Sequence, residues 1–376
     1  MNMMLLEDCC EILDSMRIPI KASDRKEGLY PYYGANGIQD HVADFIFDDE
    51  LVLLAEDGGN FGSRERPIAY RVSGKCWVNN HAHVLKPKND SLDVDYLCYS
   101  LMFYNTAGLV NGATRQKLTQ ATKREMLIPM RSIEEQKHIV EMLNRVVEIK
   151  FHRQNELVKL DELIKARFVE MFGDPVSNTK GWKRVIIDEC VDSIENGKSF
   201  VCDSMARIGE EPAILKLSAA TYGVYKPEEN KAIINESDFI EGAEVHSGDL
   251  LFTRKNTPEL VGMAAYVFMT PKKLMMPDLI FRINTKQNCR KIYLWKLINH
   301  ELFRSQIQNL ASGSAKSMSN ISKERLGKLH ICLPPLDLQI EFEKFVVQIN
   351  KSKVAVQKAL DETQLLFDSL MQKYFG

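Results

Sequence analysis

Several short segments contain residue types that enzymes use, and the spacing within each segment decides whether that chemistry is possible. The segment DSIENGKS at 192–199 ends in the Gly-Lys-Ser of a phosphate-binding loop, but Asp192 stands where that motif requires glycine. A carboxylate there would lie beside the phosphate, so a plain turn is favoured. The segments GANG at 34–37 and EDGGNFG at 56–62 have the wrong spacing for an S-adenosylmethionine loop. The Pro334-Pro335 pair lacks the preceding Asn or Asp and the following aromatic residue that adenine methylation would need.

Two histidines and two carboxylates offer a weaker signal. His81 and His83 lie two residues apart in an expected strand, hence on one face, which is compatible with two metal ligands or with a polar surface pair. No third ligand is evident from the sequence, so the surface role is favoured. Glu56 and Asp57, beside Gly58, have the residue types of acid–base catalysis, but a solvated turn is the commoner use of such a segment.

Basic, amide and hydroxyl side chains recur at similar places in the two halves of the chain, which fits DNA contact better than catalysis. Lys and Arg bind phosphates, whereas Arg, Asn and Gln read base edges. Each residue alone is ordinarily a solvated surface group, and only the recurrence favours the set. The candidates, most of them expected on loops, are Tyr32, Tyr33, Asn36, Asn60, Arg64, Arg66, Asn80, His81, Arg115, Gln116 and Lys117 in the first half, and Lys216, Ser218, Tyr222, Arg254, Lys255, Asn256, Lys316, Ser317 and Ser319 in the second.

The elements that must position these residues follow from an internal duplication. The segments at 128–136 and 331–339 both end in Gln, and the distance from that Gln to a Phe-Gly pair is 173 − 136 = 37 in one copy and 376 − 339 = 37 in the other. Apolar positions between these anchors coincide at an offset of 203, since 371 − 168 = 203 relates Phe168 to Met371. The match extends upstream with small gaps, so the whole chain is two copies of one plan.

Each copy is expected to be an α+β globule followed by one long helix. Apolar residues recur three and four apart after each Gln, and no proline follows the helix start, so 132–180 and 335–376 are expected to contain helices that pair as an antiparallel coiled coil. The parts at 1–131 and 181–334 mix short β-like runs with Gly, Asn and Pro turns. Expected strands are 51–55, 68–72, 77–85, 213–217, 250–253, 263–268 and 279–283, and expected helices are 96–104 and 292–308.

Composition excludes several classes of protein. The 376 residues are 45% hydrophobic and 27% charged with a net charge of −2, which describes ordinary globular domains and excludes a disordered or polycationic chain. No membrane span or secretory signal is recognised, so a cytoplasmic protein is expected. The 8 cysteines are scattered without metal-type spacing and are expected to be reduced core residues.

Motifs in a fixed order connect the chain to a known family. They are GATRQKL at 112–118, IPMRSIEEQ at 128–136 and ARFVEMFGDP at 166–175 in the first copy, with LASGSAKSMSNIS at 310–322 and LPPLDLQ at 333–339 in the second. With these motifs the whole chain resembles the specificity subunits of type I restriction-modification systems. One departure is the start of the first globule, where little precedes Leu5, whereas the second begins with GWKRVIIDEC at 181–190. Two explanations are open for this departure, a short first strand missing from the first copy or a late start codon.

The resemblance implies a non-catalytic subunit. Its globules would be target-recognition domains, each reading one half of a bipartite double-stranded DNA sequence, and its helices would fix the gap between the halves. Two modification (methyltransferase) subunits would hold S-adenosylmethionine, so no cofactor or metal is expected in this chain, and restriction (motor-nuclease) subunits would complete the complex. A protein-interaction scaffold without DNA specificity, and an enzyme using Asp57 or His81, remain as alternatives.

Overall fold

A computed structural model describes residues 2–112, 116–312 and 318–376, which divide into two compact units. Unit 1 comprises residues 1–155 and 357–376, and unit 2 comprises residues 156–356. Each unit therefore contains one globule together with parts of both long helices.

Unit 1 is built on a six-stranded sheet with the order β2-β7-β5-β6-β3-β4. Its central strand β5 (Phe47–Ala55) is buried along its second half, and it pairs antiparallel with β6 (Ala69–Val78) and β7 (Ala82–Pro87). The other elements are β1 (Asn2–Leu5), α1 (Leu6–Cys9), β2 (Cys10–Ile12), β3 (Glu27–Gly34), β4 (Gly37–Val42), α2 (Val94–Met102), β8 (Val110–Asn111), β9 (Lys117–Leu118), α3 (Gln120–Arg124) and β10 (Leu127–Met130), with short 3-10 turns at Asp14–Met16 and Ala22–Asp24.

Unit 2 repeats this plan with smaller sheets. A four-stranded sheet has the order β12-β19-β15-β17 and a three-stranded sheet the order β14-β13-β18. The strands are β11 (Lys183–Ile186), β12 (Val191–Asn196), β13 (Ala213–Leu215), β14 (Asn230–Ala232), β15 (Leu250–Thr253), β16 (Lys255–Asn256), β17 (Ala264–Tyr266), β18 (Leu274–Met275), β19 (Ile280–Thr285), β20 (Ser319–Asn320) and β21 (His330–Leu333). The helices are α5 (Ser218–Thr221), α6 (Lys291–Ile298), α7 (Arg304–Gln308) and α8 (Lys323–Gly327), and 3-10 turns lie at Ile187–Glu189, Glu236–Asp238, Glu241–Ala243 and Glu301–Phe303.

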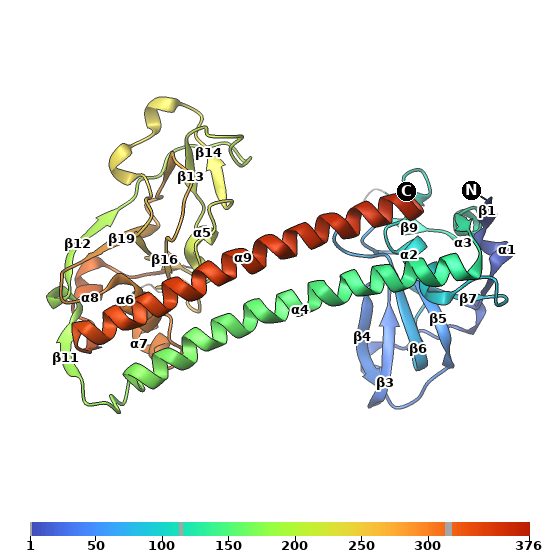
Figure 1. Ribbon diagram of the computed structural model, residues 1–376, viewed down its shortest axis with the longest axis horizontal. Helices are drawn as coiled ribbons and strands as arrows, with labels where there is room; N and C mark the ends of the chain where they lie inside the picture. Colours follow the sequence, from blue (N-terminus) through green and yellow to red (C-terminus); the bar gives the residue numbers. More distant parts are fainter. Residues whose placement is uncertain (1, 113–115, 313–317) are drawn as a thin grey trace. The chain divides into compact units, whose positions relative to one another are not determined.

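The two long helices are α4 (Ile133–Phe172) and α9 (Leu336–Phe375), each of 40 residues and unbroken (Figure 1). Ser132 and Glu135 form a capping box at the start of α4, and Gly173 ends α4 with a φ of 75°. No helix in the described part of the chain is long and apolar enough to cross a membrane.

The helices run antiparallel within each unit. In unit 1 the Lys150 ammonium lies 5.1 Å from the centre of the Phe367 ring, and in unit 2 Lys353 binds Asp161 with N–O distances of 2.8 and 2.9 Å. Within unit 1 the contacted position moves back along α9 as it moves forward along α4, from Met142 with Tyr374 to Lys150 with Phe367, so the expected antiparallel helix pair is confirmed.

The duplication is visible in buried hydrogen bonds. The side-chain amide of Gln136 accepts from the backbone N–H of Asp93 and donates to the carbonyls of Ser91 and Arg131. Gln339, at the matching position of the second copy, makes the same three bonds to Arg290, Asn288 and Pro334. Both glutamines are fully buried, so each fastens the start of a long helix to its own globule.

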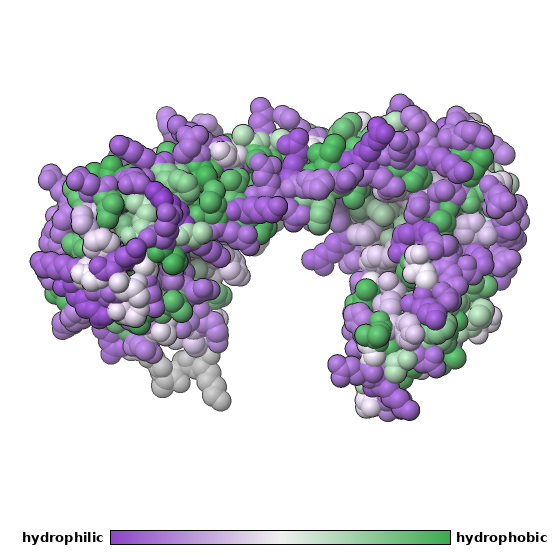
Figure 2. All heavy atoms as spheres, turned by 60° about the horizontal axis from the view of Figure 1, so that its bottom comes forward, coloured by the Kyte–Doolittle hydropathy of each residue, from purple (hydrophilic) through white to green (hydrophobic). Residues whose placement is uncertain are grey.

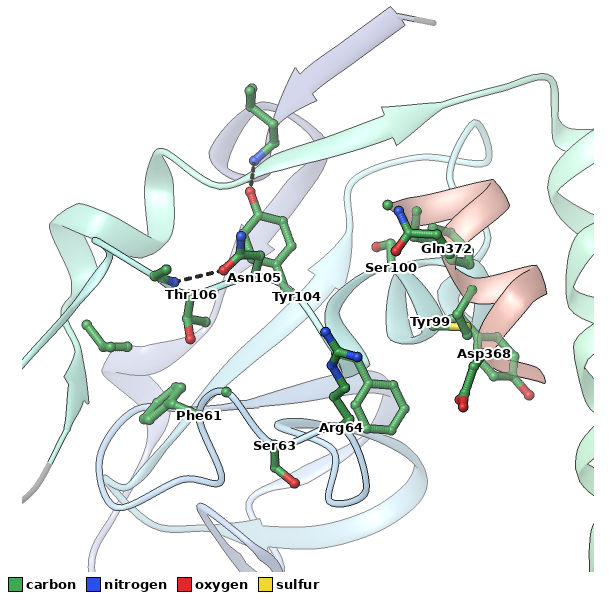
Figure 3. Close-up of a pocket in the computed structure, with 18 of the residues that line it drawn as sticks. Phe61, Ser63, Arg64, Tyr99, Ser100, Tyr104, Asn105, Thr106, Asp368 and Gln372 are labelled. Carbon is green, nitrogen blue, oxygen red and sulfur yellow. Dashed lines mark hydrogen bonds between the residues drawn. The ribbon is translucent and has the colours of Figure 1, made fainter. Parts of the chain in front are cut away.

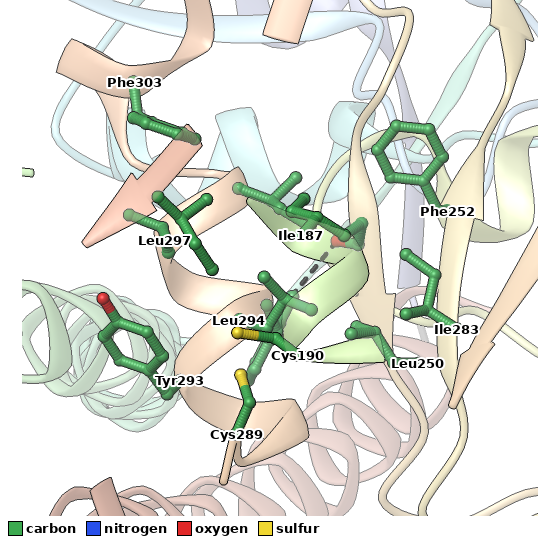
Figure 4. Packing of buried hydrophobic residues seen from close by; sticks show 14 of the residues in the cluster. Ile187, Cys190, Leu250, Phe252, Ile283, Cys289, Tyr293, Leu294, Leu297 and Phe303 are labelled. Atoms are coloured by element: carbon green, nitrogen blue, oxygen red, sulfur yellow. Dashed lines mark hydrogen bonds between the residues drawn. The ribbon is translucent and has the colours of Figure 1, made fainter. Parts of the chain in front are cut away.

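Each unit has a hydrophobic core, formed by residues of its globule together with residues from the ends of the long helices that belong to that unit. In unit 2, Leu250, Phe252 and Ile283 from the strands pack toward Leu294 and Leu297 of α6, as Figure 4 shows. The same figure shows the thiols of Cys190 and Cys289 facing one another. All eight cysteines are free thiols and seven are buried, which matches the expected core role.

Two local expectations were wrong, and one of the two alternatives for the first strand is excluded. The expected strand 77–85 is a hairpin, because β6 ends at Val78 and β7 begins at Ala82. The expected helix 292–308 is interrupted between α6 and α7 by a short 3-10 turn. The first copy does have its short first strand, since β1 pairs with β10 just as β11 pairs with β21.

Candidate nucleic-acid interface

The same strand–loop contact occurs in both globules, and we call it the junction. In the first globule the backbone N–H of Leu118 donates to the carbonyl of Glu56, and the N–H of Glu56 donates to the carbonyl of His81. In the second globule Ile321 donates to Arg254, and Arg254 donates to Leu279. Asp57 pairs with Lys117 as Lys255 pairs with Asn320. The junction therefore consists of residues 56–58 with 116–118 and residues 254–256 with 319–321.

The first junction gathers several of the predicted residues. The Lys117 ammonium lies 3.2 Å from Glu56 Oε1, and the Asn36 amide donates to the carbonyl of Gly58 at 2.9 Å. The Gly58 N–H in turn donates to the carbonyl of Gln116. Beside them, Nδ1 of His81 lies 2.5 Å from a carboxylate oxygen of Asp57.

The second junction has different side chains on the same backbone. The Arg254 guanidinium donates twice to Asn320 Oδ1 at 3.3 Å and lies 5.2 Å from the centre of the Phe281 ring. Lys255 lies 3.6 Å from Asp278, and Ser319 pairs with Asn256 across the two strands. The position occupied by acidic Glu56 in one globule is thus occupied by basic Arg254 in the other.

Five residues that were expected on loops lie in regular elements, namely Tyr32 and Tyr33 in β3, Ser218 in α5, and Lys255 and Asn256 in β16, and two of the five are buried. Tyr32 lies on β3 with 1% of its surface exposed, and its hydroxyl accepts from the backbone N–H of Ile20 at 3.1 Å. Asn256 is 7% exposed, and its amide donates to the Thr221 hydroxyl at 3.1 Å. The expectation of a loop position was wrong for all five residues, and the side chains of Tyr32 and Asn256 are used within the protein.

The remaining predicted residues are distributed around the junctions. Lys216 and Ser218 both contact Glu229, whereas Tyr222 is well exposed and directly follows the Thr221 that binds Asn256. Tyr33 lies on β3 and is half-buried. Asn60 lies near the Tyr70 hydroxyl, and Arg66 and Asn80 are exposed. Arg115, Lys316 and Ser317 lie outside the described residues.

Asn320 is a junction residue that was not predicted from the sequence. The sequence could have revealed it through the offset of 203 residues that relates the two long helices. Applied to Lys117, this offset gives Asn320, since 320 − 117 = 203. The sequence also offers a second alignment upstream of the helices, Gly112 with Gly313, whose offset is 313 − 112 = 201 and which would relate Lys117 to Met318.

A buried network of charged and polar groups lies against the first junction. Asp14 Oδ2 accepts from Lys123 Nζ at 2.6 Å and lies 2.7 Å from Nδ1 of His83. Nε2 of His83 lies 3.0 Å from the carbonyl of Leu118, so this nitrogen carries the hydrogen. Arg17 donates to Glu56 Oε2 at 2.6 Å, and Glu56 Oε2 lies 3.4 Å from Nδ1 of His83.

Ligand atoms of Asp14, Glu56 and His83 lie within 4.8 Å of one another, as a metal site would require. The carboxylate oxygens beside His83 Nδ1 are already bound by cations. Asp14 Oδ2 binds the Lys123 ammonium, and Glu56 Oε2 binds the Arg17 guanidinium. Both carboxylates thus already have cationic partners within the protein, and Glu56 has a further one in Lys117, so the cluster does not fit a bound cation. The predicted His81–His83 pair separates, since His81 faces Asp57 and His83 faces Asp14.

Acid is expected to destabilise unit 1 through this network. Burial alone would raise the pKa of Asp14, but hydrogen bonds from His83 and Lys123 outweigh it and hold that pKa well below its ordinary value of 3.8. Burial also opposes ionisation of Glu56, yet the bond from Arg17 lowers its pKa from 4.5. A carboxylate with a lowered folded-state pKa stabilises the fold above its ordinary pKa, and this contribution is lost as the pH falls further.

We expect the free energy of unfolding of unit 1 to fall by about 1–3 kcal/mol between pH 6 and pH 3. Urea unfolding followed by the fluorescence of Trp77 in the Trp182→Phe/Trp295→Phe chain measures this unit alone, because Trp77 lies in unit 1 and the other two tryptophans in unit 2. An unchanged urea midpoint over this range would contradict the expectation.

Unit 1 also contains a cavity of about 1040 Å³. Figure 3 shows Phe61, Ser63 and Arg64 on one side and Asp368 and Gln372 of α9 on another. Its described lining is mainly aromatic, amide and hydroxyl groups, with Arg64 and Asp368 as the charged side chains. These residues do not form a nucleophile–base pair, so the cavity gives no support to the enzyme alternative.

Comparison with known proteins identifies relatives of the whole chain. The family model described as "Type I restriction modification DNA specificity domain" matches residues 1–160 and 180–363. A putative type I restriction enzyme specificity subunit from Haemophilus influenzae is 27% identical over 374 residues, covering 96% of this chain and 92% of the relative. The EcoEI type I restriction enzyme specificity subunit from Escherichia coli is 30% identical over 240 residues, which are 61% of this chain and 40% of that protein.

Solved structures give the same fold. The S subunit of a type I restriction-modification system from M. genitalium aligns over 100% of this chain and 96% of its own, with a TM-score of 0.62 and 11% identity. A chain from a study of complex assembly and conformational transition in the type I system aligns equally far, with a TM-score of 0.53 and 16% identity.

Proposed function

This chain belongs to the type I restriction-modification DNA specificity family, and from that premise we propose how its two globules select DNA. It is a DNA sequence-specificity subunit, and each globule reads one half of a bipartite double-stranded target. The observation that carries the proposal is the duplicated junction, where one backbone arrangement holds Glu56 and Lys117 in one globule and Arg254 and Asn320 in the other. Equal scaffolds with different polar groups are what two different half-sites require.

The long helices supply the surfaces for protein partners. Five of their apolar side chains are each more than half exposed: Phe151, Val158, Val354, Leu365 and Leu366. Figure 2 shows hydrophobic side chains interspersed among hydrophilic ones on the face in view. Apolar groups on a charged helix surface suit contact with other helices, so we propose that two modification subunits dock there and that restriction subunits join them.

The catalytic chemistry is proposed to belong to the partners. The modification subunits bind S-adenosylmethionine and transfer its methyl group to adenine N6. This chain contributes sequence selection and, through the length of α4 and α9, the spacing between the half-sites. A net charge of −2 fits this division, since partner subunits would share the phosphate contacts.

Co-expression with a modification subunit of a type I system from the same host, followed by single-molecule mapping of N6-methyladenine, tests the proposal. We expect a two-part motif that appears only when both proteins are present. A stable complex that methylates no defined sequence would contradict the specificity role and favour the scaffold alternative. Methylation of the same motif by the modification subunit alone would also contradict it.

A further inference from the structure

The two globules differ in what they bury beneath their junctions. The matching backbone bonds of Glu56 and Arg254 relate His83 to Phe281, since 281 − 83 = 198 and 254 − 56 = 198. Thr119 and Ser322 cap α3 and α8 with their hydroxyls, which relates Lys123 to Leu326. In the second globule both related residues are apolar core residues, 1% and 0% exposed.

This difference shows that the fold does not need charged groups at these two positions. Burying an ion network costs desolvation energy, and well-packed apolar residues of similar volume are often equally or more stabilising. The second globule is built in that way, with Phe281 and Leu326 in one continuous core. Stability of the scaffold therefore does not explain why the first globule has His83 and Lys123.

The contacts of the network are directed toward the junction segment. His83 donates from Nε2 to the carbonyl of Leu118, and Lys123 lies on the helix that follows this segment. Glu56 holds Lys117 with one carboxylate oxygen and Arg17 with the other. Gln116 and Lys117, the proposed DNA contacts, thus sit on a backbone that is fixed from beneath by buried groups.

We propose that Asp14, His83 and Lys123 are positioning residues for recognition of the first half-site. His83 and Lys123 have no exposed surface and Asp14 is 8% exposed, so they act through Gln116 and Lys117 and do not touch DNA. The inference rests on the proposed function. A polar, directional support fixes the orientation of the segment, whereas an apolar core constrains it only through packing.

The main test is the variant Asp14→Asn/His83→Phe/Lys123→Leu, assembled with the modification subunits. It takes two residues from the second globule, removes one charge of each sign, and keeps an acceptor for the Val84 N–H that now binds Asp14. We expect a folded complex whose motif is unchanged in the second half. In the first half we expect either degenerate positions or a fall of at least about tenfold in methylation rate, the change that 1.4 kcal/mol produces.

A pair of single variants decides the matter if the triple variant does not fold. His83→Phe and His83→Gln both leave the Asp14–Lys123 pair intact, but only the glutamine amide can replace Nε2 as the donor to Leu118. We expect His83→Phe to relax the first half-site and His83→Gln to retain it. A first half-site unchanged in His83→Phe, or lost equally in both variants, would overturn the inference. Absence of a two-part motif with the unaltered chain would instead refute the proposed function.

Discussion

Replacing Phe168 by alanine is expected to lower the free energy of unfolding of unit 2 by about 3–5 kcal/mol. Phe168 is 2% exposed, and its ring centre lies 5.0 Å from that of Phe172, 5.6 Å from Phe342 and 5.9 Å from Tyr293. The substitution removes the central ring of this aromatic cluster and leaves a cavity that neighbouring helices fill only in part. Urea unfolding followed by the fluorescence of Trp182 and Trp295, in a Trp77→Phe background, measures unit 2 separately.

Val169→Ala is the matched control, since Val169 is the next residue of α4 and is 48% exposed. Its loss should change the stability by less than about 0.5 kcal/mol, as for most surface substitutions. Equal effects of the two substitutions would show that the aromatic cluster is not the support described. The cluster matters beyond stability, because Phe168 and Phe342 come from the two different long helices and join both to one globule.

The long helices could be predicted from the sequence because two independent signals agreed. The apolar period fitted a helix, and the equal distance of 37 residues from Gln to Phe-Gly fixed both ends. The buried glutamines explain part of this agreement. Gln136 and Gln339 each bind three backbone groups of their own copy, so their position relative to the helix start is set by geometry.

Among the strands that were not predicted, β3 and β4 lack the apolar alternation that identifies a strand in a sequence. β3 contains Pro31, which usually argues against a sheet position, and β4 at the sheet edge has the exposed side chains of Gln39, Asp40 and His41. An edge strand buries little on either face, so apolar alternation is absent. Its pairing with β3 is visible only in the folded chain.

The junction was found only in part for a related reason. Residue type and recurrence indicated Lys117 and Arg254, but they do not distinguish an exposed polar side chain from one used internally, as Tyr32 and Asn256 are. The buried network was also missed, because its members come from four separate segments. Asp14, Glu56, His83 and Lys123 become neighbours only when β5, β7 and α3 meet.

Arg254→Gln is expected to weaken recognition of one half of the target by about 1–3 kcal/mol, which is roughly 10–100-fold. The guanidinium is held in a fixed orientation by Asn320 and by the face of Phe281, so little side-chain freedom is lost when it binds a base edge. The expected result is a motif that becomes degenerate in its second half while its first half is retained. Mapping N6-methyladenine in cells that express each variant with the modification subunit measures both halves in one experiment.

The control variants separate base reading from charge. Arg254→Lys keeps the positive charge but lacks the planar fork, so a base-reading arginine predicts nearly the same loss as with glutamine. Arg184→Ala removes an equal charge from β11, a strand of a different sheet, and should leave the motif unchanged. Arg254 would be only a phosphate contact if Arg254→Lys kept the full methylation rate at the unaltered motif. The same would follow if all three variants weakened methylation of every site uniformly. The sequence preference of the second globule would then have to come from Asn320 and the residues beside it, because these are the polar groups that remain at the same junction.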